Sequence, residues 1–236
     1  MLKAQYILRL LCTVTVAAAL VHAQNPSTTD IRMRLAVSKP IALHPAPSAV
    51  IWLEPLQQTP PAQFVPEHRY TLLQKNRMFT PHLLVIPVGS VVLFPNADPF
   101  FHNVFSLFDG KRFDLGLYEA GSTKAVTFSR EGVSYIFCNI HPEMSAVVLT
   151  LSTSHYAIAD SHGEFRISDV PEGDYELHVW IEGIAQPALS SMVRRVHLAT
   201  SSGDLGAIQI PYVHYNSAAH PNMFGQPYDQ DVKPTY

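Results

Sequence analysis

The sequence predicts an all-β fold, and three observations support this class. Apolar residues occur in short runs, many of which alternate with polar residues at a period of two, as in half-buried strands. The chain has 19 prolines and 11 glycines, residues that end strands and form turns. No long stretch keeps the apolar spacing of an amphipathic helix. We therefore expect strands joined by turns and loops throughout most of the chain.

The N-terminus predicts a secretory signal peptide over residues 1–23, removed after Ala23. Lys3 and Arg9 supply positive charge before the apolar core of residues 10–21. An uncleaved anchor is the weaker interpretation, because this core falls short of the roughly 18 apolar residues that a spanning helix needs. We expect a periplasmic or otherwise exported protein with no membrane span after cleavage.

Composition limits the partners and the redox chemistry. The formal net charge is −3 and charged residues make up 15% of the chain, so no basic surface for nucleic acid or anionic membranes is expected. Of the two cysteines, Cys12 would leave with the signal peptide. Cys138 then remains as a single thiol in an oxidising compartment. Such a thiol is either buried and inert or protected by a metal.

Two groups of strands are predicted in order along the chain. The first group is expected at residues 31–37, 48–56, 83–86, 90–94, 122–128, 133–139 and 145–152. The second group begins near residue 155, where "DSHG" and "VPEGD" are turn sequences between alternating strands. Further strands are expected at 191–200 and 207–213. The remainder, rich in Pro, Asn, Tyr and Gln, predicts a flexible tail.

The segment "FCNIHPEM", residues 137–144, places Cys138, His141 and Met144 close together. Thiolate and thioether are soft ligands, and two imidazoles, one thiolate and a weak axial Met are the ligand set of a mononuclear type 1 copper. The second imidazole must come from elsewhere, and the best candidate is His102, 36 positions before Cys138 (138 − 102). Asn103 could donate its main-chain amide to the sulfur, and its side chain could tie the two ligand segments together.

Other sites and ordinary structural roles were weighed against this one. Zinc more often takes paired cysteines, and iron–sulfur clusters need several. A dinuclear copper centre would need a second cysteine four residues away, where Ser134 and Pro142 stand, and no His-x-His pair of a multicopper oxidase occurs. Singly, a buried Cys, a loop His and a core Met are unremarkable. Their joint order and spacing favour copper, and an electron carrier over an enzyme.

Residues 78–104, together with "CNIHPEM" (138–144), resemble the cupredoxin, or blue copper, family. The Cys-x2-His-x2-Met spacing is similar to that of its amicyanin and plastocyanin-like members, and the resemblance covers about residues 70–153. It implies a Greek-key β-sandwich that binds copper through His102, Cys138 and His141 as equatorial ligands and Met144 as the axial one. The chain departs from the family around residues 98–118, which are longer and more aromatic.

Residues 163–180 resemble a second β-sandwich, the carboxypeptidase-regulatory-like module. Residues 36–55 resemble its opening strands, which leaves two placements open: in the second sandwich, or as an extension of the cupredoxin sheet. The predicted organisation is a signal peptide (1–23), a leader with strands (24–63), a cupredoxin domain (64–153), a second small β-sandwich (154–212) and a flexible tail (213–236).

The predicted function is transfer of single electrons between redox partners, such as a cytochrome or an oxidoreductase. We expect transient docking near His141, whose ring edge should reach the surface, and a dry shell from Phe100, Phe101 and Pro142. The alternatives are a copper delivery or sequestration protein and a structural β-sandwich protein without redox role. The motif "HPNM" (220–223) and four scattered histidines are expected to be ordinary polar positions: His155, His162, His178 and His197.

Overall fold

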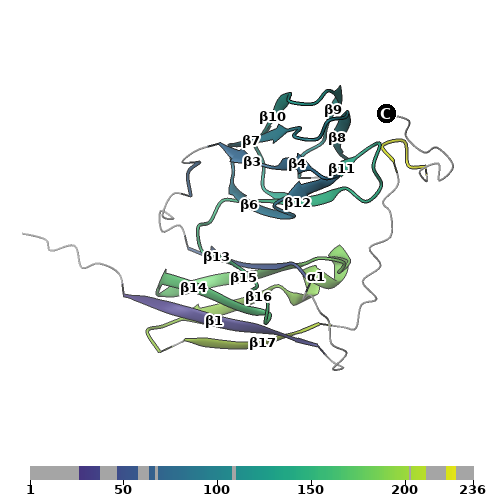
Figure 1. Cartoon of the computed structure of the whole chain (residues 1–236). Coiled ribbons are helices and arrows are strands. Elements are labelled where there is room, and N and C mark those ends of the chain that lie inside the picture. Colours follow the sequence, from purple (N-terminus) through teal and green to yellow (C-terminus); the bar gives the residue numbers. More distant parts are fainter. Residues whose placement is uncertain are drawn as a thin grey trace, which may run out of the picture.

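The computed structural model describes residues 27–37, 47–57, 64–66, 69–107, 110–201, 203–210 and 222–226. The predicted signal peptide, residues 1–23, lies outside these ranges, and only residues 222–226 of the predicted tail fall within them. No helix in the described ranges is both long enough and apolar enough to span a bilayer. The predicted all-β class is confirmed: the described chain forms strands in stacked sheets with one short helix (Figure 1).

The first sandwich, in the upper part of Figure 1, consists of two sheets and a small hairpin. Its five-stranded sheet has the order β6 (Leu83–Pro87), β12 (Ser145–Leu151), β11 (Gly132–Cys138), β8 (His102–Ser106), β9 (Phe113–Tyr118). Its three-stranded sheet has the order β10 (Thr123–Phe128), β7 (Ser90–Pro95), β3 (Tyr70–Thr71). The hairpin pairs β4 (Leu73–Lys75) with β5 (Met78–Thr80).

The chain crosses repeatedly between these two sheets. The chain turns at "PVG" (87–89), between β6 and β7, and at "REG" (130–132), between β10 and β11. In both cases, however, the flanking strands lie in different sheets and do not pair as hairpins. Gly89 and Gly132 have φ values of 88° and 129°, which other residues rarely adopt, so glycine permits both corners.

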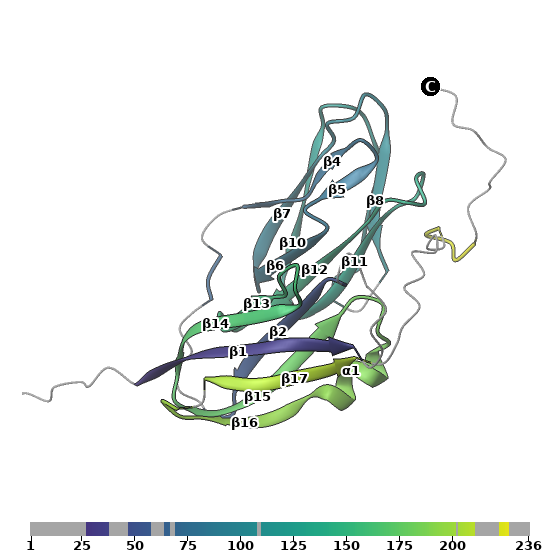
Figure 2. The ribbon, with the colours of Figure 1, turned by 60° about the horizontal axis from the view of Figure 1, so that its bottom comes forward.

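The second sandwich combines strands from both ends of the described chain. One sheet has the order β13 (Tyr156–Ile158), β2 (Ala49–Pro55), β15 (Gly173–Ile181), β16 (Arg194–Leu198), and the other β14 (Glu164–Pro171), β1 (Thr28–Val37), β17 (Asp204–Ile210). Strand β1 runs antiparallel to β14 and parallel to β17. The pairing thus decides between the two placements that the sequence left open. The first sandwich is inserted between β2 and β13, and Figure 2 shows β1 and β2 among the later strands.

One element differs in type from the prediction. Residues 191–200 were expected to be a strand, but Ser191 and Met192 end the short helix α1 (Gln186–Met192), and β16 begins only at Arg194. A proline stands in its first turn, a position that helices tolerate. Seven residues are too few to show a helical period in the sequence, and burial of Leu189 holds the helix on the sandwich.

The two sandwiches stack, so that the five-stranded sheet is covered on both faces. In β12, Ala146 and Val148 belong to the core of the first sandwich, whereas Val147 and Leu149 belong to the core shared with the second. This explains why residues 146–149 of β12 form a continuous apolar run, as expected of a strand buried on both faces. Cys138 lies in the first core, fully buried.

Candidate metal centre

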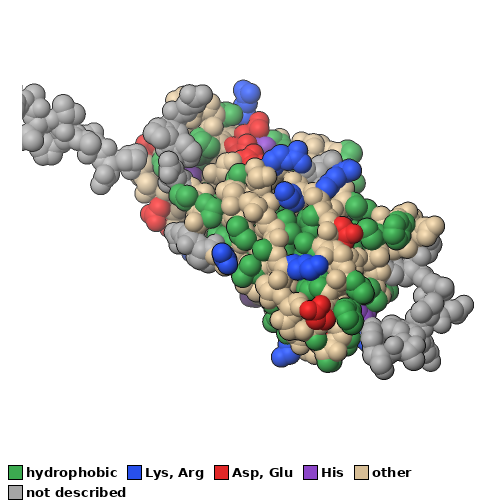
Figure 3. All heavy atoms as spheres, turned by 90° about the horizontal axis from the view of Figure 1, so that it is seen from above, with side chains coloured by type: hydrophobic (Ala, Val, Ile, Leu, Met, Phe, Trp, Pro, Cys, Tyr) green, Lys and Arg blue, Asp and Glu red, His purple; other side chains and the backbone are tan. Residues whose placement is uncertain are grey.

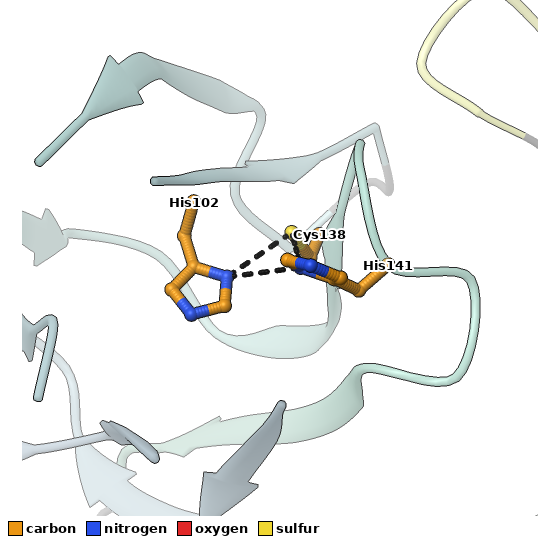
Figure 4. A group of neighbouring side chains, drawn as sticks. All are labelled: His102, Cys138 and His141. Atoms are coloured by element: carbon orange, nitrogen blue, oxygen red, sulfur yellow. Dashed lines mark hydrogen bonds between the residues drawn. The ribbon is translucent and has the colours of Figure 1, made fainter. Parts of the chain in front are cut away.

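Three side chains converge at one end of the first sandwich (Figure 4). The Sγ atom of Cys138 lies 3.6 Å from Nδ1 of His102 and 3.5 Å from Nδ1 of His141, and the two Nδ1 atoms are 3.2 Å apart. All three residues are buried. The structure thus brings together three of the four residues that the sequence selected for a metal, across 39 positions of chain.

The elements of the sandwich explain this convergence. His102 is the first residue of β8 and Cys138 the last of β11, and these strands are antiparallel neighbours, so both positions meet at one sheet end. The loop after Cys138 is closed by two main-chain bonds: Cys138 N–H donates to the carbonyl of Met144 (3.2 Å), and Met144 N–H donates to that of His141 (3.1 Å). This tight loop returns His141 toward the sulfur.

The separations suit a common metal ion. Bonds of about 2.0–2.1 Å to nitrogen and about 2.3 Å to sulfur in a tetrahedral site place ligand atoms roughly 3.3–3.6 Å apart. The three observed separations, between 3.2 and 3.6 Å, fall close to this range. The donor set of two imidazoles and one thiol is also that of a type 1 copper site. The residues present therefore fit a copper ion.

Asp98 orients the His102 ring by binding Nε2, the nitrogen that does not face Cys138. Its Oδ2 accepts a bond from Nε2 of His102 (3.0 Å), and its carboxylate also accepts the main-chain N–H groups of Asn76 (2.6 Å) and Arg77 (3.0 Å). Burial alone would raise the pKa of Asp98, but these bonds outweigh it and hold the pKa below its ordinary value. The ionised carboxylate keeps the proton on Nε2, which leaves Nδ1 as a lone-pair donor. Asp98 was not among the residues selected from the sequence, because its place four residues before His102 is one of several nearby polar positions that could have reached the ring.

The sulfur of Cys138 is enclosed by main-chain donors. Burial raises the pKa of its thiol, and the N–H groups of Asn103, Ile140 and His141 act in the opposite direction. Because burial dominates, the free thiol keeps its proton. Because the N–H groups favour the charged form, they would stabilise the thiolate once a metal displaces that proton.

The prediction for the side chain of Asn103 was wrong. Its Nδ2 donates to Oδ1 of Asp114 on β9 (2.7 Å), away from the loop that carries Cys138. The bond that ties the two ligand segments is made by the main chain, where Asn139 N–H donates to the carbonyl of Asn103 (2.9 Å). The segment after His102 thus forms β9, and Asp114 on this strand accepts the hydrogen bond from the side-chain amide of Asn103.

His141 differs most from expectation. Its ring edge was predicted to reach the surface, but the residue is only 3% exposed. Burial, followed by the electrostatic effects of the neighbouring His102 and Arg77, lowers the pKa of His141 to about 4, so His141 is neutral and able to bind a metal at neutral pH. The ring of Phe100 lies 5.5 Å from that of His141.

The apolar shell is only partly the predicted one. Phe100 packs against His102 as well, with ring centroids 5.4 Å apart, whereas Phe101 is 49% exposed and shields little. The described tail segment, residues 222–226, lies against the ligand loop: Met223 N–H donates to Oδ1 of Asn139 (2.9 Å). Met144 is fully buried in the same core cluster as Cys138, and its role as the axial ligand stays a prediction.

Comparisons with known proteins match part of this chain to several solved structures. No family model and no curated protein matches the chain. A novel purple cupredoxin from Nitrosopumilus maritimus is 26% identical over 35% of this chain and 99% of its own, with a TM-score of 0.32. A copper-containing nitrite reductase from Thermus scotoductus is 25% identical over 36% of this chain and 22% of its own, with a TM-score of 0.34.

A third solved structure is a reduced amicyanin variant. It is 19% identical over 37% of this chain and 86% of its own, with a TM-score of 0.34. All three TM-scores are below 0.5, so these likenesses do not establish a family, and each leaves most of this chain unmatched. We therefore base the functional argument on the geometry of the site.

Proposed function

We propose that this chain is an exported type 1 copper protein that carries single electrons between redox partners. The observation that carries the proposal is the convergence of two imidazole Nδ1 atoms and one sulfur within 3.6 Å of one another, all buried. His102, Cys138 and His141 would hold the ion, with Met144 as the weak axial ligand. When bound, copper supplies a couple between Cu(I) and Cu(II).

The residues of the site favour this role by restricting movement and water. His102 is fixed by Asp98, and His141 by a loop with two main-chain bonds. Rigid ligands would hold the copper in a geometry intermediate between those that Cu(I) and Cu(II) prefer. The ligands would then move little when the copper gains or loses an electron. The N–H groups around the sulfur and the exclusion of water would set the reduction potential. A flexible, exposed site would better suit a delivery or sequestration protein.

The proposed partner is another redox protein, a cytochrome or an oxidoreductase, that docks transiently at the end of the first sandwich. Large apolar side chains are exposed on this sandwich: Met78, Phe101, Leu107 and Leu117. Figure 3 looks down on the first sandwich from above and shows hydrophobic side chains in green among scattered charged ones. A small apolar surface with few charges suits a short-lived encounter. Export is supported by the predicted signal peptide, residues 1–23.

The experiment is an absorption spectrum of the purified chain loaded with Cu(II). We expect an intense visible band from charge transfer between sulfur and copper, which Cys138→Ser abolishes. The control variant His162→Asn alters an exposed histidine of the second sandwich and should leave the band unchanged. A colourless complex, or a band that survives Cys138→Ser, would refute the proposed centre.

A second measurement separates an electron carrier from a delivery protein. A carrier should give reversible voltammetry and retain its copper while a cytochrome is reduced or oxidised. A delivery protein should instead lose copper to an acceptor without such exchange. Retention of copper with no electron exchange would leave the centre in place and overturn the carrier role.

A further inference from the structure

A second group of metal-binding side chains lies on the second sandwich, well apart in the sequence from the first. Glu54 on β2 and Glu176 and His178 on β15 place one ligand atom each within 4.8 Å of the others. In the antiparallel register Glu176 is directly opposite Glu54, and His178 is opposite Trp52. These side chains therefore share one face of the sheet. The sequence suggested only an ordinary polar role for His178.

The ring nitrogen at the centre of this group lacks the partner that a buried nitrogen normally has. Nε2 of His178 lies 3.4 Å from Oε2 of Glu54 and 3.2 Å from Oε2 of Glu176. Neither approach has the geometry of a hydrogen bond, and Nε2 is buried without one. The separations match the roughly 3.3 Å between nitrogen and oxygen ligands of one tetrahedral zinc ion. These three atoms are therefore better placed to bind one shared cation than to hydrogen-bond to each other.

Trp52 holds two of the three ligands in place. Its indole Nε1–H donates to Oε1 of Glu54 (2.9 Å), which leaves Oε2 turned toward the group. Its ring also stacks on the imidazole of His178, with centroids 5.1 Å apart and planes 10° from parallel. Outer contacts of this kind fix the orientation of metal ligands and are as important to affinity as the ligands are.

Charge and exposure also suit a cation. Two carboxylates directly opposite each other on adjacent strands repel, and a cation between them removes that repulsion. The side chains of Glu54, Glu176 and His178 are 43%, 35% and 19% exposed, so an ion could enter from solvent without opening the fold. Arg195, the cross-strand neighbour of Glu176 on β16, is the nearest competing positive group in the register.

We propose that Glu54, Glu176 and His178 form a zinc site with one position left for water. Imidazole favours zinc over magnesium or calcium, and the absence of a sulfur ligand distinguishes the group from the one at Cys138. The site lies in the sandwich whose role the sequence left open, and it stabilises that sandwich when filled. It does not depend on the proposed electron transfer.

Zinc binding to the full chain tests this proposal through a difference between variants. Because zinc could also enter the group at Cys138, the quantity of interest is the number of zinc ions lost when only the second group is altered. By calorimetric titration with zinc alone, we expect the wild-type chain to bind one more equivalent than His178→Asn does. Where loss is partial, we expect binding weaker by a factor on the order of ten or more.

A matched control uses another histidine of the same sandwich. His197 pairs with a single carboxylate, Asp174, at 2.8 Å and is 71% exposed, so His197→Asn should bind as much zinc as the wild type. Glu54→Gln gives a second test if His178→Asn does not fold. The nuclear magnetic resonance signal of the Trp52 indole N–H should also shift when zinc is added to the protein. If His178→Asn and Glu54→Gln bind zinc with the same stoichiometry and the same affinity as the wild type, or if the Trp52 signal does not move, the proposal is overturned.

Discussion

At the residue scale, the candidate copper site depends on a carboxylate as much as on its ligands. Asp98 holds His102 through Nε2 and is itself held by two main-chain N–H groups. This arrangement selects the tautomer that leaves Nδ1 facing Cys138. The spacing of the ligands was visible in the sequence. The partner of Nε2 was not, because any of several nearby polar residues could have reached it.

Asp98→Asn should weaken copper binding without removing a ligand. A neutral amide binds the ring N–H less strongly and accepts one bond where the carboxylate accepts several, so we expect copper affinity to fall by about 10–100-fold. Competition with a copper chelator of known affinity measures this loss. Asp160→Asn, a change in an exposed turn of the second sandwich, is the control and should leave the affinity unchanged. Equal affinities in the two variants would contradict the assigned role of Asp98.

At the element scale, Gly110, just before β9, packs closely on β11. A Cβ atom added to Gly110 would lie 2.6 Å from Oγ of Ser134 and 2.7 Å from the carbonyl oxygen of Val133. Main-chain atoms cannot move aside cheaply, so this close approach requires glycine. Neither β9 nor this contact was predicted, although Phe113, Leu115 and Leu117 of β9 alternate at a period of two. The contact joins Gly110 to residues more than twenty positions later, a distance that no local sequence pattern covers.

Gly110→Ala should therefore destabilise the first sandwich. We expect the free energy of unfolding to fall by about 1–3 kcal/mol, the usual cost of overpacking. Urea denaturation of the apoprotein measures it. Gly203→Ala is the matched control, since the added Cβ would lie 3.6 Å from its nearest neighbour, an ordinary contact. If both substitutions cost the same, the close packing of this loop is unimportant for stability.

The tail segment at residues 222–226 lies against the ligand loop and is expected to affect electron exchange at the candidate copper site. It is attached to the ligand loop through the bond from Met223 N–H to Oδ1 of Asn139, two residues before the buried His141. We expect deletion of residues 222–236 to expose His141 and to speed electron self-exchange of the copper-loaded protein severalfold. Deletion of residues 227–236 alone should change little. Line broadening in nuclear magnetic resonance spectra measures the exchange, and equal rates in both deletions would exclude a shielding role.

At the scale of the whole molecule, the two sandwiches share apolar side chains and polar contacts. Trp180 Nε1–H donates to the hydroxyl of Tyr135 (3.3 Å), and His82 lies 2.7 Å from Glu182. The bond to Glu182 raises the pKa of His82 above its ordinary 6.5, although burial acts against it. The folded protein thus binds this proton more tightly than the unfolded chain does.

The contribution of this ion pair should depend on pH. Because the folded pKa is raised, the pair stabilises the fold fully below about pH 6.5, and the contribution disappears as the pH rises through the raised pKa. His82 is 40% exposed, so we expect no more than about 1 kcal/mol. The difference in unfolding free energy between wild type and Glu182→Gln, measured by urea denaturation of the apoprotein across this range, should shrink with rising pH. A difference that grows or stays constant would contradict this sign.

The sequence by itself determined the β class, most turns and the selection of His102, Cys138, His141 and Met144, because alternation, turn residues and short ligand spacings are local properties of a chain. Only the tertiary structure decided where β1 and β2 pair, that His141 is buried and that Asp98 orients His102. It alone brought His178 to two glutamates. The physical reason is the same in each case: which surfaces meet depends on how the sheets stack, and that stacking is a sum over many weak contacts between distant residues.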